Sequence, residues 1–263
     1  MKRILLLCMA LCAFAAEAQT IEKPSFVTRT RDDFALRGPV KEVYEKHIMN
    51  RNDPELQDTD YHSYTFAPDG RLIRETVNDV DRICVMEYTY EGSRLVRIDA
   101  EGDCGQTMTI TYSPDGRKAS VKIAYGTTEL DSFTVEYNDK GLPCRYEGFT
   151  CIWSHDGLLQ SIGNTYWSRA YFYTDDGQPA QPNGSNVSQK RLTHEIQSDN
   201  TRKEYIYNKQ GDIAEIIITS CNTSHGITRQ ETFKPHFSYK YDAHGNWVSE
   251  GKNTLRRIIY YDE

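Results

Sequence analysis

The stretch at residues 239–247, YKYDAHGNW, decides the fold class because altered copies of it recur along the chain. Other segments align with it on their glycine. They are YTFAPDGRLI (64–73), YTYEGSRLV (88–96), ITYSPDGRKA (110–119), VEYNDKGLPC (135–144), CIWSHDGLLQ (151–160), YFYTDDGQPA (171–180) and YIYNKQGDIA (205–214). An internal repeat of this kind indicates one supersecondary unit used many times.

Each copy reads as a β-hairpin. Two large or aromatic residues at positions i and i+2 point to the same face of a strand. Asp, Asn, Ser or Thr then precedes two turn positions and a glycine, whose left-handed conformation closes the turn, as in Pro68-Asp69-Gly70. The copy at 88–96 lacks two loop residues and needs a tighter turn. The sequence therefore predicts an all-β fold, an irregular array of antiparallel β-hairpins forming a curled or partly closed extended sheet.

The predicted domain organisation has three parts. Residues 1–18 form a signal peptide, residues 19–35 an N-terminal linker, and residues 36–263 the hairpin domain. An exposed loop or subdomain boundary is expected near 181–193, where QPNGSNVS has little to bury. The segment KEVYEKHIM (41–49) could form two helical turns, but the β character of its surroundings favours a strand.

The N-terminus predicts export. Lys2 and Arg3 precede an apolar run at 4–16, and Ala16-Glu17-Ala18 offers small residues to a signal peptidase. The expected location is periplasmic, cell-surface or extracellular, with no transmembrane helix after signal cleavage. The net charge of −7 and the interspersed basic residues argue against a nucleic-acid partner.

Signal cleavage leaves an odd number of cysteines: Cys84, Cys104, Cys144, Cys151 and Cys221. If Glu147-Gly148 is a two-residue turn, Cys144 and Cys151 lie opposite each other, which makes them the pair to test first. That position is hydrogen-bonded, which strains a cross-strand disulfide. The spacings contain no CxxC, and neither a metal nor a cofactor is expected.

Three tryptophans are the candidate sugar-binding platforms: Trp153, Trp167 and Trp247. Trp153 and Trp247 occupy repeat positions that Tyr, Leu or Ile fill elsewhere, which favours the core for both. Trp167 lies outside the repeat frame and heads the candidates for a binding surface. His244 with Asp242, and His155 with Asp156, resemble acid/base pairs, but their positions are turn positions where other polar residues serve equally. No catalytic motif is present, and no catalytic residue is predicted.

The pattern aromatic-x-Tyr-Asp-x-x-Gly-Asn, whole in YKYDAHGN, resembles the YD repeat of the bacterial Rhs proteins and the teneurins. The opening LRGPVKEV (36–43) and the ending LRRIIYYDE (255–263) look like the small exported YD-repeat proteins of the Bacteroidetes. This resemblance covers roughly residues 36–263 and implies a curled sheet of hairpins. Large Rhs proteins form a closed shell around a toxin, but this chain has too few hairpins for that, so encapsulation and self-cleavage are not carried over.

The sequence leaves two functions open. The first is an exported, non-catalytic β-repeat binding or structural module at the cell envelope or outside the cell, whose partner is a protein or a glycan. The alternative is a secreted hydrolase acting on polysaccharide or peptide, with carboxylates assembled across strands. A deep pocket with converging carboxylates or histidines would favour the enzyme, and a shallow aromatic or edge-strand surface would favour binding.

Overall fold

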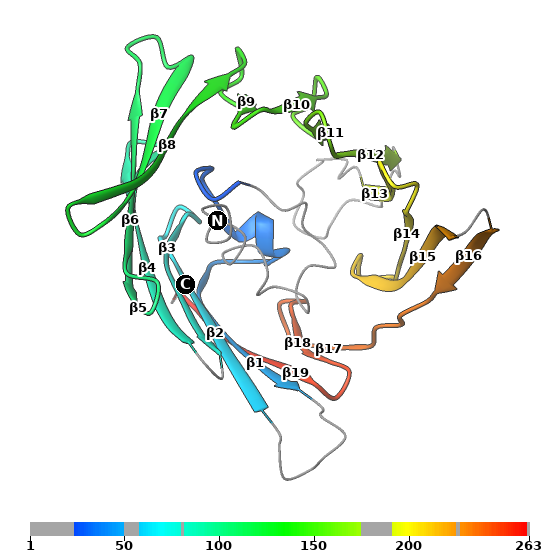
Figure 1. Ribbon diagram of the computed structural model, residues 1–263. Coiled ribbons are helices and arrows are strands. Elements are labelled where there is room, and N and C mark those ends of the chain that lie inside the picture. The colour runs from blue at the N-terminus through cyan, green and yellow to red at the C-terminus, as the bar shows by residue number, and fades with distance from the viewer. Residues whose placement is uncertain (1–23, 50–57, 80–81, 175–190, 225–226, 262–263) are drawn as a thin grey trace. The chain divides into compact units, whose positions relative to one another are not determined.

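The computed structural model describes residues 24–49, 58–79, 82–174, 191–224 and 227–261 of the chain (Figure 1). It divides the chain into two compact units. The first unit contains residues 1–112, 119–133 and 238–263, and the second contains residues 113–118 and 134–237. The division therefore falls away from the segment 181–193, where the sequence predicted a loop or boundary. Residues 181–190 of that segment lie outside the described residues.

All the described strand pairs are antiparallel, which confirms the predicted all-β array of hairpins. The strands begin with β1 Val40–Met49, β2 Asp58–Phe66, β3 Leu72–Asp79, β4 Arg82–Glu91, β5 Arg94–Gly102, β6 Gln106–Tyr112, β7 Lys118–Tyr125 and β8 Thr128–Tyr137. They continue with β9 Pro143–Tyr146, β10 Phe149–Trp153, β11 Leu159–Gly163, β12 Ser168–Thr174, β13 Arg191–Gln197, β14 Arg202–Tyr207, β15 Ile213–Ser224 and β16 Ile227–Phe233. The last are β17 Tyr239–Tyr241, β18 Trp247–Glu250 and β19 Thr254–Tyr260.

Helical structure is nearly absent from the described residues. It consists of one 3₁₀ turn, η2, at Arg31–Phe34. The segment 41–49, which also fitted two helical turns, is strand β1. No helix in the described ranges combines the length and the apolar character needed to span a bilayer.

The first unit places the two ends of its sequence side by side. Strand β1 pairs on one edge with β2 and on the other with β19, so the first strand of the described residues is an interior strand (Figure 1). From β19 the pairing continues to β18 and β17, and from β2 it continues in chain order to β7. Within the second unit, β9 to β16 also pair in chain order.

The predicted turns form as the repeat requires. In six copies the residue before the turn donates its N–H to the carbonyl four residues on, or five on at Ser113, and accepts the N–H of the turn glycine. In the opening stretch these are the bonds from Asp242 N to Asn246 O (2.9 Å) and from Gly245 N to Asp242 O (3.2 Å). Gly245 has a φ of 81°, which a residue with a Cβ rarely adopts. The shortened copy turns through Gly92 and Ser93 alone, as its length predicts.

In five copies the aromatic residue that precedes the turn donates a hydrogen bond to a carbonyl of the neighbouring hairpin. The Tyr90 hydroxyl donates to the Leu72 carbonyl (2.6 Å), and Tyr207 donates to the Leu192 carbonyl (2.7 Å). Tyr112, Tyr173 and Trp153 donate in the same way to Leu95, Leu159 and Pro143. The preference for Tyr over Phe at this position follows, because a buried carbonyl left without a donor is costly.

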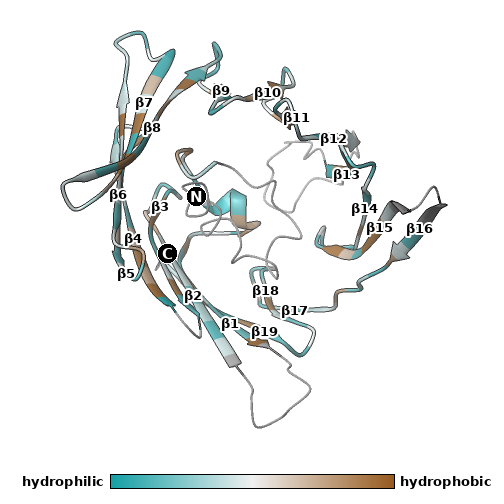
Figure 2. Cartoon of the chain, viewed as in Figure 1, coloured by the Kyte–Doolittle hydropathy of each residue, from teal (hydrophilic) through white to brown (hydrophobic). Residues whose placement is uncertain are grey.

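Hydrophobic and hydrophilic residues alternate along the strands (Figure 2). On one face of the first unit, Leu36, Val40, Val43, Tyr64, Phe66 and Leu72 form a buried core cluster. Phe34 packs onto it, with its ring centroid 4.6 Å from that of Tyr64 and 5.3 Å from that of Phe66. The described part of the predicted linker 19–35 packs onto this unit: Phe34 of η2 contacts the core cluster, and the buried Phe26 contacts Phe133, with ring centroids 5.7 Å apart.

Asn246, the asparagine of the repeat pattern, joins the start of the hairpin domain to its last hairpin. Its Oδ1 accepts the N–H of Arg37 (2.6 Å), and its Nδ2 donates to the Arg37 carbonyl (2.8 Å). Nδ2 also donates to the Tyr260 hydroxyl (2.7 Å). The side chain is 2% exposed and acts as a substitute for a backbone amide. This role explains an asparagine at a position where the other copies carry other residues.

The cysteine pairing differs from the one that the sequence favoured. Cys144 and Cys151 are free thiols, and the disulfide joins Cys84 to Cys104, with Cα atoms 5.5 Å apart. The turn at Glu147-Gly148 forms as predicted and pairs Phe149 with Tyr146, so the expected register is correct. The pairing was wrong because a cross-strand position of the hydrogen-bonded type does not suit disulfide geometry. Cys104 lies in the bend that follows β5. The bend returns the chain toward β4, where Cys84 lies.

Candidate functional site

The strands β1 to β4 present two faces of opposite character. The inner face carries Val43 and Tyr64 of the core cluster, and the outer face carries the residues that alternate with them. The register places Glu45 opposite His62 on the inner face and Tyr44 opposite Ser63 on the outer face. Polar side chains of functional interest lie on both faces.

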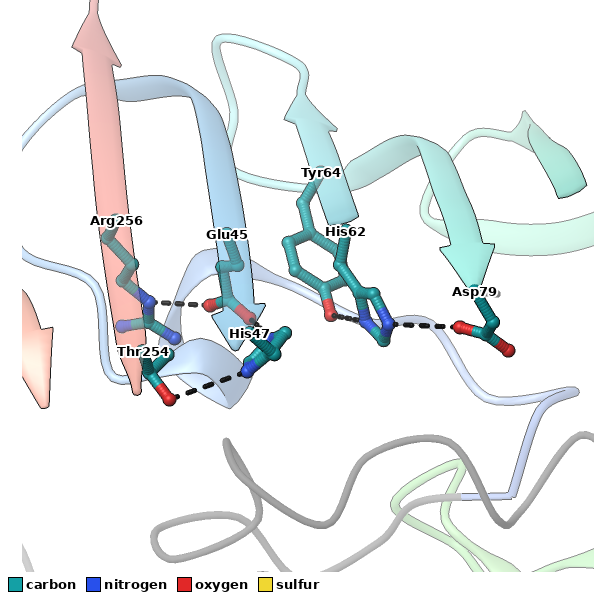
Figure 3. Close-up of polar contacts among 7 residues, drawn as sticks. All are labelled: Glu45, His47, His62, Tyr64, Asp79, Thr254 and Arg256. Atoms are coloured by element: carbon teal, nitrogen blue, oxygen red, sulfur yellow. Dashed lines mark hydrogen bonds and ion pairs between the residues drawn. The ribbon is translucent and has the colours of Figure 1, made fainter. Parts of the chain in front are cut away.

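The inner face holds a buried polar group, here called the Glu45 cluster (Figure 3). Its members are Glu45, His47, His62, Tyr64, Asp79, Thr254 and Arg256. They come from β1, β2, β3 and β19, so four strands from both ends of the sequence build it. Four of its members are buried: Glu45, His62, Thr254 and Arg256.

An ion pair forms the centre of the Glu45 cluster. Arg256 Nε donates to Glu45 Oε1 (2.5 Å), and the side chains of the two residues are 3% and 0% exposed. The Arg256 guanidinium also lies over the ring of Trp247, 3.3 Å from its centroid. Cross-strand pairing of Glu45 with Arg256 brings the charges together, since opposite residues of antiparallel strands are close neighbours.

Two histidines extend the cluster beyond this pair (Figure 3). His47 Nε2 lies 3.3 Å from Glu45 Oε2, and its Nδ1 lies 3.5 Å from the Thr254 hydroxyl. His62 lies between the Tyr64 hydroxyl (3.5 Å from Nδ1) and Asp79 Oδ1 (3.6 Å from Nε2). The two imidazole centroids are 5.1 Å apart. Each ring therefore has one carboxylate partner and one hydroxyl partner.

A second buried carboxylate, Glu75, lies opposite Tyr64 on β3. Its Oε2 accepts hydrogen bonds from Arg29 (2.8 Å) and from the Tyr88 hydroxyl (2.7 Å). Arg29 comes from the segment before η2, and its guanidinium lies 4.7 Å from the Phe34 ring centroid. This ion pair attaches the N-terminal segment to the sheet of the first unit.

Burial and neighbouring charge move the pKa values of two nearby carboxyls in opposite directions. Burial alone would raise the pKa of Glu45, but Arg256 and His47 together lower it to about 2. Burial raises the pKa of Glu250 to about 7, because the attraction of Arg256 only partly offsets its desolvation. Burial also raises the pKa values of the Tyr64 and Tyr88 hydroxyls. Glu45 is therefore ionised throughout the physiological range, whereas Glu250 titrates near neutrality.

Glu250 is expected to make the protein less stable as the pH rises. Its folded pKa lies above its unfolded value, so its contribution is fully present below about pH 4.5 and is lost as the pH rises through about 7. The free energy of unfolding of the unaltered protein should fall by about 1–2 kcal/mol more between about pH 5 and about pH 8 than that of Glu250→Gln. This figure is reduced for the partial solvent exposure of Glu250. Urea unfolding at both pH values measures this, with the exposed Glu101→Gln as the control. Equal pH dependence in Glu250→Gln and in the unaltered protein would contradict it.

The acidic and basic groups of the Glu45 cluster are bonded to one another and not to an open site. Both oxygens of Glu45 already have partners, and each histidine is engaged on both ring nitrogens. A general base or nucleophile needs a substrate within hydrogen-bond reach. Within the described part of the chain, no three His, Cys, Asp or Glu side chains are grouped to hold a metal ion. The arrangement therefore has a structural role: it links β1, β2, β3 and β19 through buried polar contacts.

The outer face of the same strands carries an open pocket of about 150 Å³. Tyr44, Tyr61, Ser63, Thr76 and Asn78 line it, together with Glu45 and His62, which lie between them along the strands. Tyr44 and Tyr61 are 38% and 48% exposed. We call these five outer-face residues, Tyr44, Tyr61, Ser63, Thr76 and Asn78, the Tyr44–Tyr61 pocket.

The tryptophans named from the sequence take three different positions. Trp247 is 6% exposed beneath Arg256, so it belongs to the core and not to a binding surface. Trp153 is half-buried, and its indole N–H donates to the Pro143 carbonyl (2.6 Å). Trp167 is half-buried too and contacts Phe149 edge-on, with centroids 6.4 Å apart. Trp247 belongs to the first unit, and Trp153 and Trp167 belong to the second.

The histidines in turns have the positions expected of turn residues. His244 is exposed and stacks on Tyr260, with centroids 4.0 Å apart, while Asp242 Oδ1 accepts the N–H groups of His244 and Asn246. The side chain of His155 is 97% exposed and lies 3.6 Å from Asp156. Neither pair lines the pocket.

The sequence analysis missed the Glu45 cluster and the Tyr44–Tyr61 pocket. The pocket lies on β1 to β3 and the cluster on β1 to β3 and β19, and β1 lies outside the aligned repeats. A usable signal was present in YEKH (44–47), where a tyrosine and a lysine alternate with a glutamate and a histidine. Such alternation indicates two polar faces on one strand, one of which must be buried. The residues that contact this segment could be identified only from the register of β1 with β2 and β19.

Comparisons with known proteins define no family. No protein-family model and no curated protein matches the sequence. Among solved structures, the fold is similar to that of a porin-like protein from Bacteroides uniformis, with 11% sequence identity and a TM-score of 0.38. The match covers 85% of this chain and 98% of that chain. Similarity at this level assigns neither a family nor a function.

Proposed function

We propose that this chain is an exported, non-catalytic β-hairpin repeat module of the YD-repeat type. It binds a protein or a glycan at the cell envelope or outside the cell. The observation that supports this most is the division of roles between the two faces of β1 to β3. The charged groups of the inner face are buried and bonded to one another, and the aromatic and polar groups of the outer face line an open pocket.

The pocket favours binding over catalysis for two physical reasons. Its volume of about 150 Å³ is below the range of about 300–1,000 Å³ typical of sites that enclose a substrate. Its outer-face lining consists of Tyr, Ser, Thr and Asn, and the Glu45 and His62 that also border it are already bonded within the Glu45 cluster. Tyr with small polar residues is the composition of recognition surfaces, because it combines rigid contact area with adaptable hydrogen bonding.

A second candidate, the secreted hydrolase, rests on the opposed pKa shifts of Glu45 and Glu250. Two carboxyls whose environments separate their pKa values are typical of acid/base catalysis. The complete burial of the Glu45 side chain and its bonds to Arg256 and His47 weigh against it, because they keep the carboxylate from contact with a substrate.

The mature protein, immobilised and incubated with an envelope extract and with a glycan array, tests the proposal. Specific capture of an envelope protein or a glycan supports it, and capture of neither refutes it. The same extract is assayed for new reducing ends and new amino termini. Release of either that is abolished in Glu250→Gln would replace the binding proposal with the hydrolase.

A further inference from the structure

We propose that the Tyr44–Tyr61 pocket binds an acidic glycan, that is, an oligosaccharide containing uronic acid. The inference rests on the proposed binding function and names the site and the ligand class. It is carried by the placement of two exposed tyrosines, a row of hydroxyl and amide side chains, and two cations on the outer face of β19, β1, β2 and β3.

The strand register builds the pocket from two parallel rows of side chains. One row crosses the sheet as Leu255, Lys46, Tyr61 and Asn78, and the next as Arg257, Tyr44, Ser63 and Thr76. Tyr44 on β1 and Tyr61 on β2 are therefore diagonal neighbours, about 7–8 Å apart at their backbones. That spacing allows a single pyranose ring to contact both aromatic side chains.

The two tyrosine rings are held in place before any ligand arrives. The Tyr44 hydroxyl donates to Glu42 (2.6 Å), and the guanidinium of Arg257 lies 4.6 Å from the Tyr44 ring centroid. The ammonium of Lys46 lies 5.9 Å from the Tyr61 ring centroid. Preorganised side chains lose little rotamer entropy on binding. The apolar ring face of a sugar, which carries C–H groups, stacks on aromatic rings of this kind.

Ser63, Thr76 and Asn78 supply the hydrogen-bonding groups. Hydroxyl groups donate and accept, and an amide does both through separate atoms. Sugar hydroxyls need this mixed capacity, since each is itself both donor and acceptor. The three residues occupy β2 and β3 next to the tyrosines, so one ligand ring reaches aromatic and polar groups together.

The rim of the pocket selects for negative charge. The cations Lys46 and Arg257 border it on the strand edge nearest β19, whereas Glu42 is already bonded to Tyr44 and lies beside Lys41 (3.5 Å). This local basic character stands out in a chain of net charge −7. Complementary charge at a rim raises the association rate and orients the ligand. A sugar carboxylate meets these cations while its ring lies on the tyrosines.

A protein partner is less favoured by the same geometry. Stable protein interfaces bury about 1,200–2,000 Å² around an apolar centre. The pocket has a volume of about 150 Å³, which suits one sugar ring and is small for the centre of such an interface. Protein binding is therefore an outcome that the test must distinguish.

The test titrates the full mature chain with uronic acid oligosaccharides and with neutral oligosaccharides of the same length. The uronic acid series should bind more tightly, and added salt should weaken its binding. Tyr44→Ala and Tyr61→Ala should each weaken it about tenfold or more. Tyr44→Phe, which keeps the ring, should stay within about threefold, and Lys46→Met should remove the preference for acidic sugars.

Two control variants keep the result interpretable. Tyr125→Ala removes a tyrosine that is 63% exposed in the same unit but outside the pocket, and Trp167→Ala removes the aromatic residue that the sequence favoured. Neither should change binding. Circular dichroism and urea unfolding of every variant show whether a loss of binding reflects a loss of folding.

The outcomes separate this inference from the proposed function. Binding of an envelope protein or glycan that is unchanged in Tyr44→Ala and Tyr61→Ala keeps the binding function and overturns this site. A preference for neutral oligosaccharides, or loss of glycan binding in Trp167→Ala alone, also overturns it. Absence of any specific ligand refutes the binding function and this inference together.

Discussion

Replacing Arg256 by methionine should destabilise the protein by about 3–5 kcal/mol at neutral pH, because the variant leaves the Glu45 carboxylate charged, buried and without its main partner. The cation over the Trp247 ring is lost as well. Without Arg256, desolvation raises the pKa of Glu45 above its unfolded value, so the penalty should shrink at low pH, where Glu45 is protonated. Urea unfolding from about pH 4 to about pH 8 measures both effects.

Two further variants identify the cause of this loss. The double variant Glu45→Leu with Arg256→Met should recover most of the stability, since apolar residues can replace a buried ion pair at little net cost. The exposed pair Arg97–Asp99 lies in the same unit, and Arg97→Met should cost at most about 1 kcal/mol. If Arg256→Met costs no more than Arg97→Met, the Glu45 cluster does not hold the four strands together.

Removing the disulfide with Cys84→Ala and Cys104→Ala should cost about 3 kcal/mol, the loop entropy expected for a sequence separation of 20 residues. The bond joins β4 to the bend after β5, where Asp103 also accepts the N–H of Ile83 (2.7 Å). A reductant should therefore lower the urea midpoint of the unaltered protein and leave that of the double variant unchanged.

The cysteine pair that the sequence favoured provides the control. In Cys144→Ala with Cys151→Ala, the effect of the reductant should persist, because both residues are free thiols. Peptide mapping under non-reducing conditions gives the pairing directly. A 144–151 crosslink in that map, together with loss of the reductant effect in this variant, would reverse the assignment.

The hairpins could be predicted from the sequence because their causes are local. Turn chemistry at Asp242 and Gly245, and the i, i+2 aromatic pair of Tyr239 and Tyr241, act within nine residues. The same locality explains why the register at Glu147-Gly148 was correct although the disulfide prediction was wrong. A turn fixes which residues face each other, whereas bonding two sulfurs depends on the geometry of that position.

The candidate site could not be predicted in the same way because its members are far apart in the chain. Glu45 and Arg256 lie 211 residues apart and meet only because β1 pairs with β19. Tyr44 and Tyr61 become neighbours only when the register of β1 on β2 is known. The sequence left Trp247 open as a core residue or a sugar-binding platform, and its burial shows that it is a core residue.

The repeated hairpin, its turns and the antiparallel all-β class follow from the amino-acid sequence alone, since backbone preferences and side-chain alternation act over a few residues. The three-dimensional structure was needed to establish which strands are neighbours, that Asn246 bonds the backbone of Arg37, and which face of β1 is buried. The reason is physical. Those features depend on desolvation and on contacts between segments from opposite ends of the chain, and no local interaction specifies them.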